Sequence, residues 1–166
     1  MYHCFGIVSS YWKTVYNSCM NVNYRDFEEC DFDDFKDMVF GLYQEDPEGL
    51  PIDEEKIRKT VCENRVHPEK LNIVLICADG QTAGYAILVF FWSNEYGGNI
   101  TVIDELYIKK EYRGKQIAAD FIKYQSAREN AVALEVETTA SNHAAMRLYK
   151  RLGFEVSEND RLILML

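Results

Sequence analysis

The distribution of apolar and polar positions along the chain predicts an alternation of strands and helices. Apolar, β-rich runs bounded by turn signals such as Asp79-Gly80 are typical of strands. Apolar positions at helical spacing behind a capping residue are typical of helices. In chain order the pattern predicts a strand at 21–27, a helix from Asp31 to the break at 47–51, a helix from Asp53 to about Arg65, strands at 71–78, 81–93 and 100–109, a helix at about 114–128, a strand at 132–136, a helix at 142–152, and a final strand pair at 154–156 and 162–166.

This order of elements predicts an α/β fold. The unit between residues 100 and 138 is long enough for a parallel strand–helix–strand crossover, whereas the other strand connections are hairpin-like. We therefore expect a mixed, mostly antiparallel central sheet with helices on both faces. Residues 20–166 form one predicted domain. Residues 1–19 stand outside it as an N-terminal extension, with Met20 as a candidate natural start.

Composition narrows the class of protein. Hydrophobic residues make up 48% of the chain and aromatic residues 13%, which is typical of a globular protein. No apolar run approaches the roughly 20 residues of a membrane span, so we expect a cytoplasmic protein with no membrane partner. Five scattered cysteines without a C-x-x-C pair, and three histidines without ligand spacing, argue against a disulfide framework and a metal site.

Charge changes along the chain. The net charge is −9, and residues 1–100 carry 17 acidic and 8 basic side chains, whereas residues 101–166 carry 10 of each. Within 109–128 the balance is positive. A basic region this local indicates a small anionic ligand and not a nucleic acid. On charge alone, a solvated acidic face that keeps the protein in solution is the competing interpretation.

The segment EYRGKQIAAD (111–120) carries the first candidate site. Arg113, Gly114 and Lys115 follow an apolar strand and precede a predicted helix. The free N–H groups and the dipole of a helix N-terminus both favour negative charge, so this arrangement is suited to phosphate. An ordinary strand-to-helix turn with surface cations would have the same residue types.

A second segment supports the phosphate interpretation. Together, ELYIKKEYRGKQIAADFI and the later TTASNHAAMRLYKRLGF resemble the GNAT superfamily of N-acetyltransferases over roughly residues 21–166. The more specific part is the pattern formed by Asn142, Ala145, Tyr149, Gly153 and Phe154. The closest similarity is to the diamine and small-amine branch. The resemblance implies acetyl-CoA as co-substrate, no metal, and a possible homodimer.

The resemblance also implies positions for the cofactor. The main chain of Leu106, Tyr107 and Ile108 would pair with the pantetheine arm as an added strand. Asn142 would reach the pantetheine amides, and Tyr149 would lie beside the thioester sulfur. The pyrophosphate would be held by the loop and first helical turn, Arg113, Gly114, Lys115, Gln116, Ile117, Ala118 and Ala119. Gln116 departs from the family pattern, which has glycine there.

Transfer of an acetyl group to an amine requires a proton acceptor, and Asp104 and Glu105 lie on the implied strand. Adjacent strand residues point to opposite faces, so only one should reach the cleft unless a bulge intervenes. Position before the loop favours Asp104; both could also be ordinary polar residues. Tyr149 is the candidate acid for the departing thiolate, with core packing as its alternative role.

These residues predict an N-acetyltransferase that moves acetyl directly from acetyl-CoA to a primary amine. Thirteen acidic residues lie between Asp26 and Glu55, in helices that flank the acceptor side in the superfamily. They favour a small cationic acceptor, such as a polyamine-like amine or an aminoglycoside. A protein N-terminus or lysine is the alternative acceptor, and a non-catalytic acyl-CoA-binding sensor is the alternative class of protein.

Overall fold

The computed structural model describes residues 20–47, 50–128, 131–157 and 162–165 of the 166-residue chain. The predicted extension at 1–19 therefore lies outside the described residues. The elements are β1 (Val22–Asp26), the 3-10 turn η1 (Glu29–Asp31), α1 (Phe32–Glu45), α2 (Glu54–Val66), β2 (Leu71–Ala78), β3 (Gln81–Ser93), β4 (Gly98–Ile108), the 3-10 turn η2 (Lys110–Tyr112), α3 (Ile117–Ser126), β5 (Ala133–Val136) and α4 (His143–Arg151).

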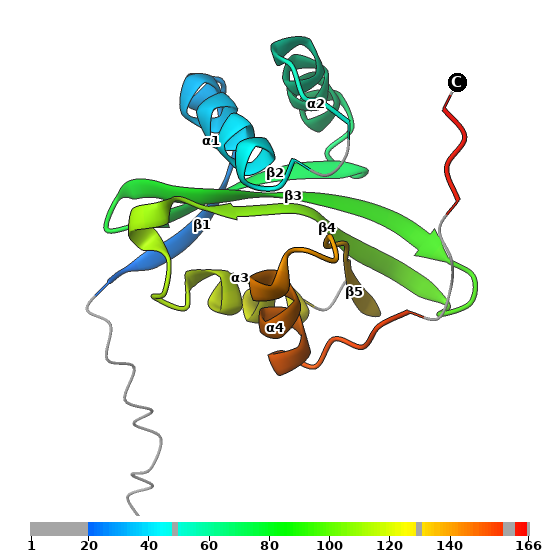
Figure 1. Cartoon of the computed structure of the whole chain (residues 1–166). Helices are drawn as coiled ribbons and strands as arrows, with labels where there is room; N and C mark the ends of the chain where they lie inside the picture. Colours follow the sequence, from blue (N-terminus) through cyan, green and yellow to red (C-terminus); the bar gives the residue numbers. More distant parts are fainter. Residues whose placement is uncertain (1–19, 48–49, 129–130, 158–161, 166) are drawn as a thin grey trace, which may run out of the picture.

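One five-stranded sheet in the order β1-β2-β3-β4-β5 organises the molecule. The first three pairings are antiparallel, and only β4 and β5 are parallel, with α3 between them in sequence. Helices α1 and α2 cover one face of the sheet, and α3 and α4 cover the other (Figure 1). The predicted mixed α/β fold, including the parallel crossover, is confirmed.

Each face of the sheet has its own core. On the α1/α2 side, Phe35, Val39 and Ile57 pack on Tyr85 and its neighbours, with the Phe35 and Tyr85 rings edge to face at 5.0 Å between centroids. On the opposite side, Phe121 of α3 packs on the sheet face that carries, among others, Ala86, Leu88 and Ile103. Because strands alternate their side chains, β3 supplies both cores from successive residues. The sheet is therefore buried on both faces along its central strands.

The predicted final strand pair is wrong for the residues that the structure describes. Residues 154–157 and 162–165 have no regular secondary structure, and residue 166 lies outside the described ranges. The chain leaves α4 through Gly153, whose φ is +94°, and the Phe154 N–H donates to the Tyr149 carbonyl at 3.1 Å. Phe154 is therefore committed to the helix end and packs against Tyr149.

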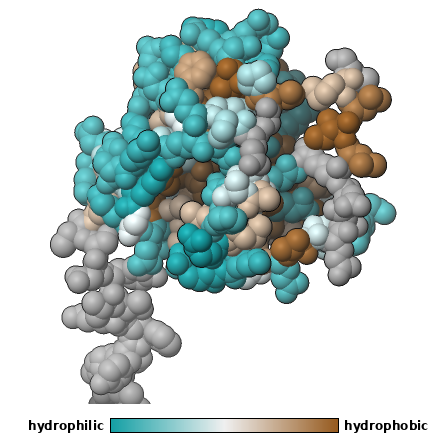
Figure 2. All heavy atoms as spheres, viewed as in Figure 1, coloured by the Kyte–Doolittle hydropathy of each residue, from teal (hydrophilic) through white to brown (hydrophobic). Residues whose placement is uncertain are grey.

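The apolar residues Leu162–Met165 are exposed, with Leu162 at 93% and Leu164 at 85%. Figure 2 shows the apolar side chains of the C-terminal segment together at one edge of the molecule. Their apolar pattern resembles a strand, but no strand partner lies beside them in the described chain. As for membranes, none of the helices described here combines the length and the apolar character needed for a bilayer span.

Candidate active site

Strands β4 and β5 separate half-way along β4. Their pairing begins at Ile100 with Ala133 and ends at Ile103 with Val136, where β5 stops. β4 continues to Ile108, still paired with β3 on its other side. In the described chain, the β5-side edge of Leu106–Ile108 therefore has no strand partner. An extended polyamide can add to such an edge through main-chain hydrogen bonds, and this is where the sequence predicted the pantetheine arm.

A β-bulge lies at the same point of β4. Ile87 pairs with Glu105 and Leu88 with Ile103, so Asp104 is an extra residue in β4. Ile103 is buried in the α3/α4 core, whereas Glu105 turns toward α1. Without the bulge, residues 103 and 105 would share a face. From the sequence, only one of the two carboxylates was expected to reach the cleft unless a bulge intervenes, and a bulge is present at this point.

Glu105 is held by two tyrosines from different elements. The Tyr43 hydroxyl of α1 donates to Oε1 at 3.0 Å, and the Tyr85 hydroxyl of β3 donates to Oε2 at 2.6 Å. Burial raises the pKa of Glu105, the two hydrogen bonds oppose that rise, and nearby Asp104 adds to it. Asp104 itself is exposed. The two carboxylates therefore differ sharply in environment, although they are adjacent in sequence.

The predicted phosphate loop has the backbone of an anion site. Helix α3 begins at Ile117, three residues later than predicted, because Gln116 adopts a left-handed conformation with φ +65° as its N-cap. Gly114 also has a positive φ, of +73°. The first helical hydrogen bond runs from the Asp120 N–H to the Gln116 carbonyl, so the N–H groups of 117–119 precede the helical ladder. These donors and the helix dipole favour an anion at this point.

The left-handed conformation of Gln116 is one that glycine, the residue implied by the family pattern, adopts more easily. Glycine populates positive φ without cost, whereas other residues lose roughly 1–2 kcal/mol there. Gln116 and Asp79 are the two non-glycine residues with positive φ in the described chain. Gln116 therefore keeps the backbone that glycine would give, at the expense of local strain.

Of the two predicted cations, Arg113 is already engaged. Its Nε donates to the Ile108 carbonyl at 2.7 Å, and its guanidinium forms an ion pair with Glu45 at 2.8 Å. It also lies over the Tyr107 ring, 5.2 Å from the centroid. Lys115 is exposed and lies 5.3 Å from the centroid of the Tyr112 ring. The sequence did not identify Glu45, which terminates α1 and is 68 residues away from Arg113.

The neighbouring acid, Asp46, reaches the start of α4. It accepts hydrogen bonds from the Thr139 hydroxyl at 3.0 Å and from the Asn142 side-chain amide at 3.3 Å. The side-chain oxygen Oδ1 of Asn142 accepts from the Ala145 N–H and caps α4. The end of α1 thus contacts both segments that the sequence assigned to the cofactor, the loop at Arg113 and the start of α4.

Tyr149 lies on α4, and its side chain is partly buried against the α3/α4 core. Its ring is 5.6 Å from that of Phe154, and burial raises its pKa. A raised pKa keeps the hydroxyl protonated at neutral pH, as a proton donor requires. The ring contact with Phe154 is also what the alternative role in core packing requires, so the geometry is compatible with a proton donor and with a packing residue.

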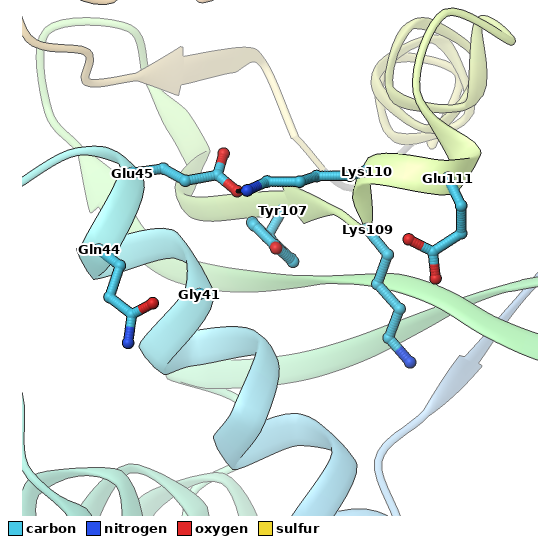
Figure 3. A pocket seen from close by; sticks show the side chains of 7 residues that line it. All are labelled: Gly41, Gln44, Glu45, Tyr107, Lys109, Lys110 and Glu111. Carbon is cyan, nitrogen blue, oxygen red and sulfur yellow. Dashed lines mark ion pairs between the residues drawn. The ribbon is translucent and has the colours of Figure 1, made fainter.

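A cleft of about 460 Å³ lies between α1 and the end of β4. Figure 3 shows Glu45 and Lys110 meeting across it, close to the Tyr107 ring. Of the predicted cofactor-binding residues, Tyr107 lines this cleft. Its remaining lining residues are Gly41, Gln44, Glu45, Lys109, Lys110 and Glu111. The cleft therefore adjoins the loop at Arg113 from the α1 side.

The sequence profile of the Acetyltransferase (GNAT) family matches residues 12–154, and the chain belongs to this family. It is therefore an acetyltransferase that uses acetyl-CoA as co-substrate. A comparison with curated proteins gives no match.

Solved structures share the fold. A possible acetyltransferase from Clostridium difficile 630 superposes with a TM-score of 0.75 at 21% identity, covering 87% of this chain and 97% of that one. The ribosomal-protein-alanine N-acetyltransferase from Brucella melitensis biovar Abortus 2308 has a TM-score of 0.66 at 17% identity, covering 87% and 100%. AAC(6')-Iy, solved with the bisubstrate analogue CoA-S-monomethyl-acetylneamine, has a TM-score of 0.67 at 16% identity, covering 88% and 97%.

The conformation of Gln116 leads to a stability prediction. Gln116→Gly should raise the free energy of unfolding by about 0.5–1 kcal/mol, because relief of strain exceeds the added entropy of the unfolded chain. Lys115→Gly is the matched control, since residue 115 has no positive φ and should gain nothing. Urea denaturation of both variants measures the difference. Equal changes in the two variants would contradict the assignment of strain to Gln116.

Proposed function

We propose that this enzyme transfers the acetyl group directly to the primary amine of a small cationic molecule, polyamine-like or aminoglycoside-like. The main support for this proposal is the point after Ile103 at which β4 and β5 are no longer paired. One strand–loop–helix segment carries a strand edge without a partner among the described strands, a helix N-terminus and two carboxylates. This arrangement supplies a place for a polyamide arm, a place for phosphate and a proton acceptor.

The residues present fit acetyl-CoA as the bound co-substrate. The edge of Leu106–Ile108 would hold the pantetheine arm, and the N–H groups of 117–119 would hold the pyrophosphate, with Lys115 beside it. Asn142 would exchange its hydrogen bond to Asp46 for one to the pantetheine. Acetyl-CoA supplies an activated acetyl group.

Within this site we assign the proton acceptor to Glu105. An amine with a solution pKa near ~10 must lose a proton to become a nucleophile. Glu105 faces the α1 side and has a pKa raised by burial, which brings it closer to the working pH. Asp104 is exposed on the bulge, and this difference reverses the preference that position alone gave. Tyr149 would donate the proton that the departing thiolate takes up.

The charge of α1 and the following segment supports a cationic acceptor. Residues 26–55 contain thirteen acids and one base, Lys36. Several of these acids form ion pairs, such as Asp34 with Lys109, but the segment stays negative overall. The AAC(6')-Iy complex contains an acetylneamine analogue, and the Brucella enzyme is named for a ribosomal protein, so small amines and protein N-termini are the two acceptor classes to compare.

Thiol release from acetyl-CoA across a panel of amines tests the proposal. The panel contains spermidine, putrescine, aminoglycosides, and peptides with a free N-terminal alanine or an internal lysine. Turnover with a small polycation, exceeding that with either peptide at least about tenfold in kcat/KM, is expected. Preferred turnover of a peptide would establish the other acceptor class. Binding of acetyl-CoA without turnover of any amine would favour a sensor.

Tyr149→Phe tests the proton donor. We expect kcat to fall at least about tenfold, because a positioned general acid contributes on the order of 10²–10⁴. The dissociation constant for acetyl-CoA, measured by calorimetry, should change less than about twofold. Tyr124→Phe on α3 is the control and should leave both quantities unchanged. An unchanged kcat in Tyr149→Phe would leave Tyr149 with packing alone.

Glu45→Gln tests the competition between an internal carboxylate and the cofactor phosphates for Arg113. Arg113 holds the pKa of Glu45 below its usual range, so Glu45 is ionised at neutral pH. Removing that charge frees the guanidinium, and acetyl-CoA should bind about two- to fivefold more tightly in ~0.1 M salt, the scale of an exposed ion pair. Glu111→Gln removes a nearby charge that has no ion pair with Arg113 in the described chain. An equal effect in both variants would indicate long-range electrostatics only.

A further inference from the structure

Tyr43, Tyr85 and Glu105 form a three-member hydrogen-bond network that joins α1, β3 and β4. Each carboxylate oxygen of Glu105 accepts from a different phenol, at 3.0 Å from Tyr43 and 2.6 Å from Tyr85. Tyr85 is fully buried, and its ring is fixed by Phe35 at 5.0 Å and Tyr107 at 6.1 Å between centroids. The carboxylate is therefore held from two directions, one of them anchored in the core.

This network compensates poorly for burying a carboxylate. Among the described residues, Glu105 forms no ion pair, and Lys109, four residues further along the chain, is paired with Asp34. A buried carboxylate is usually paired with a cation, whereas Glu105 accepts hydrogen bonds from two neutral hydroxyls, those of Tyr43 and Tyr85. Asp104, the exposed neighbour, adds like charge. The free energy of burying this carboxylate is therefore offset mainly by two hydrogen bonds from neutral hydroxyls.

The geometry also determines which form of Glu105 the network favours. Burial keeps both phenols protonated, and the pKa of Tyr43 and that of Tyr85 lie above the ordinary range. The ionised carboxylate accepts from both phenols at once, whereas the protonated acid could keep both contacts only by donating to one phenol oxygen, so the two donated bonds favour the ionised form. Each oxygen keeps a further lone pair that can accept a proton.

We propose that Tyr43 and Tyr85 are positioning residues for acetyl transfer, which hold Glu105 ionised and fix its orientation as the proton acceptor. This inference rests on the proposed function, because it assigns the supports of the base in that same site. Neither tyrosine touches the reacting atoms in this role. The groups that act on Glu105 are Tyr43 from α1, Tyr85 from β3, and Asp104 from β4.

The pH dependence of turnover tests the inference. Tyr43→Phe and Tyr85→Phe each remove a donor to the ionised carboxylate, so the pKa of Glu105 rises and the acidic limb of kcat/KM for the amine moves to higher pH. We expect a loss of about tenfold or more at pH 6 that narrows to a few-fold at pH 9, with an unchanged dissociation constant for acetyl-CoA. Tyr24→Phe is the control, since Tyr24 is a partly buried tyrosine on the opposite side of the sheet.

A second measurement is independent of turnover. Carboxyl carbon NMR of the full-length protein follows the titration of Glu105 directly, with Glu105→Gln to assign its signal. The midpoint should rise in Tyr43→Phe and in Tyr85→Phe, and it should stay in place in Tyr24→Phe. Phenylalanine preserves ring shape, and a cooperative thermal unfolding transition in each variant establishes that the fold is retained.

The outcomes separate this inference from the proposed function. A wild-type enzyme that binds acetyl-CoA but acetylates no amine would overturn the proposed function, and with it any role for the tyrosines in catalysis. A wild-type enzyme that acetylates amines, while both variants keep its pH profile and its Glu105 midpoint, would overturn only the positioning role. A uniform loss of rate at every pH, with an unmoved midpoint, would assign the tyrosines to structure alone.

Discussion

The structure depends on one strand that makes two different pairings. β4 is paired with β3 from Gly98 to Ile108, but with β5 only as far as Ile103. The long pairing supports β4 on one side, so its second half keeps its strand conformation although its other edge has no strand partner among the described residues. The bulge at Asp104 lies where the two pairings diverge and turns Glu105 toward α1. The edge, the carboxylates and the loop that follows are all placed by this divergence.

The sequence predicted the order of elements from β1 to α4 and the parallel crossover, because apolar periodicity and turn residues are local signals. The bulge at Asp104 was considered in the sequence analysis but was not predicted, although the sequence contains a signal for it. In a straight strand Asp104 would share a face with Val102, Leu106 and Ile108. With the bulge, Ile103 joins Leu106 and Ile108 in one core, and the charge leaves that face. The start of α3 was misplaced for a related reason, since the φ of Gln116 depends on tertiary structure.

The contacts of α1 were beyond sequence reasoning. Tyr43 meets Glu105, Glu45 meets Arg113, and Asp46 meets Asn142, across separations of 62, 68 and 96 residues. The Tyr43 ring packs against the core on the α1/α2 side, but helical periodicity says nothing of where its hydroxyl donates. The acids at the end of α1 contributed to a general negative charge. Only the packing of α1 over β3 and β4 shows that the end of this helix borders the whole candidate site.

Two locally unfavourable features lie in this one region, the left-handed Gln116 and the buried Glu105. For Glu105 the cost depends on pH. Burial raises its folded pKa above the unfolded value, so the folded state binds the proton more tightly than the unfolded chain. The resulting contribution to stability is present below the unfolded pKa and is lost as the pH rises through the folded pKa. The hydroxyls of Tyr43 and Tyr85 reduce that loss by bonding the ionised form. Glu105 is ionised, as a proton acceptor must be, only at pH values where its raised pKa no longer contributes to stability. The hydrogen bonds from Tyr43 and Tyr85 lower the free-energy cost of burying that ionised form.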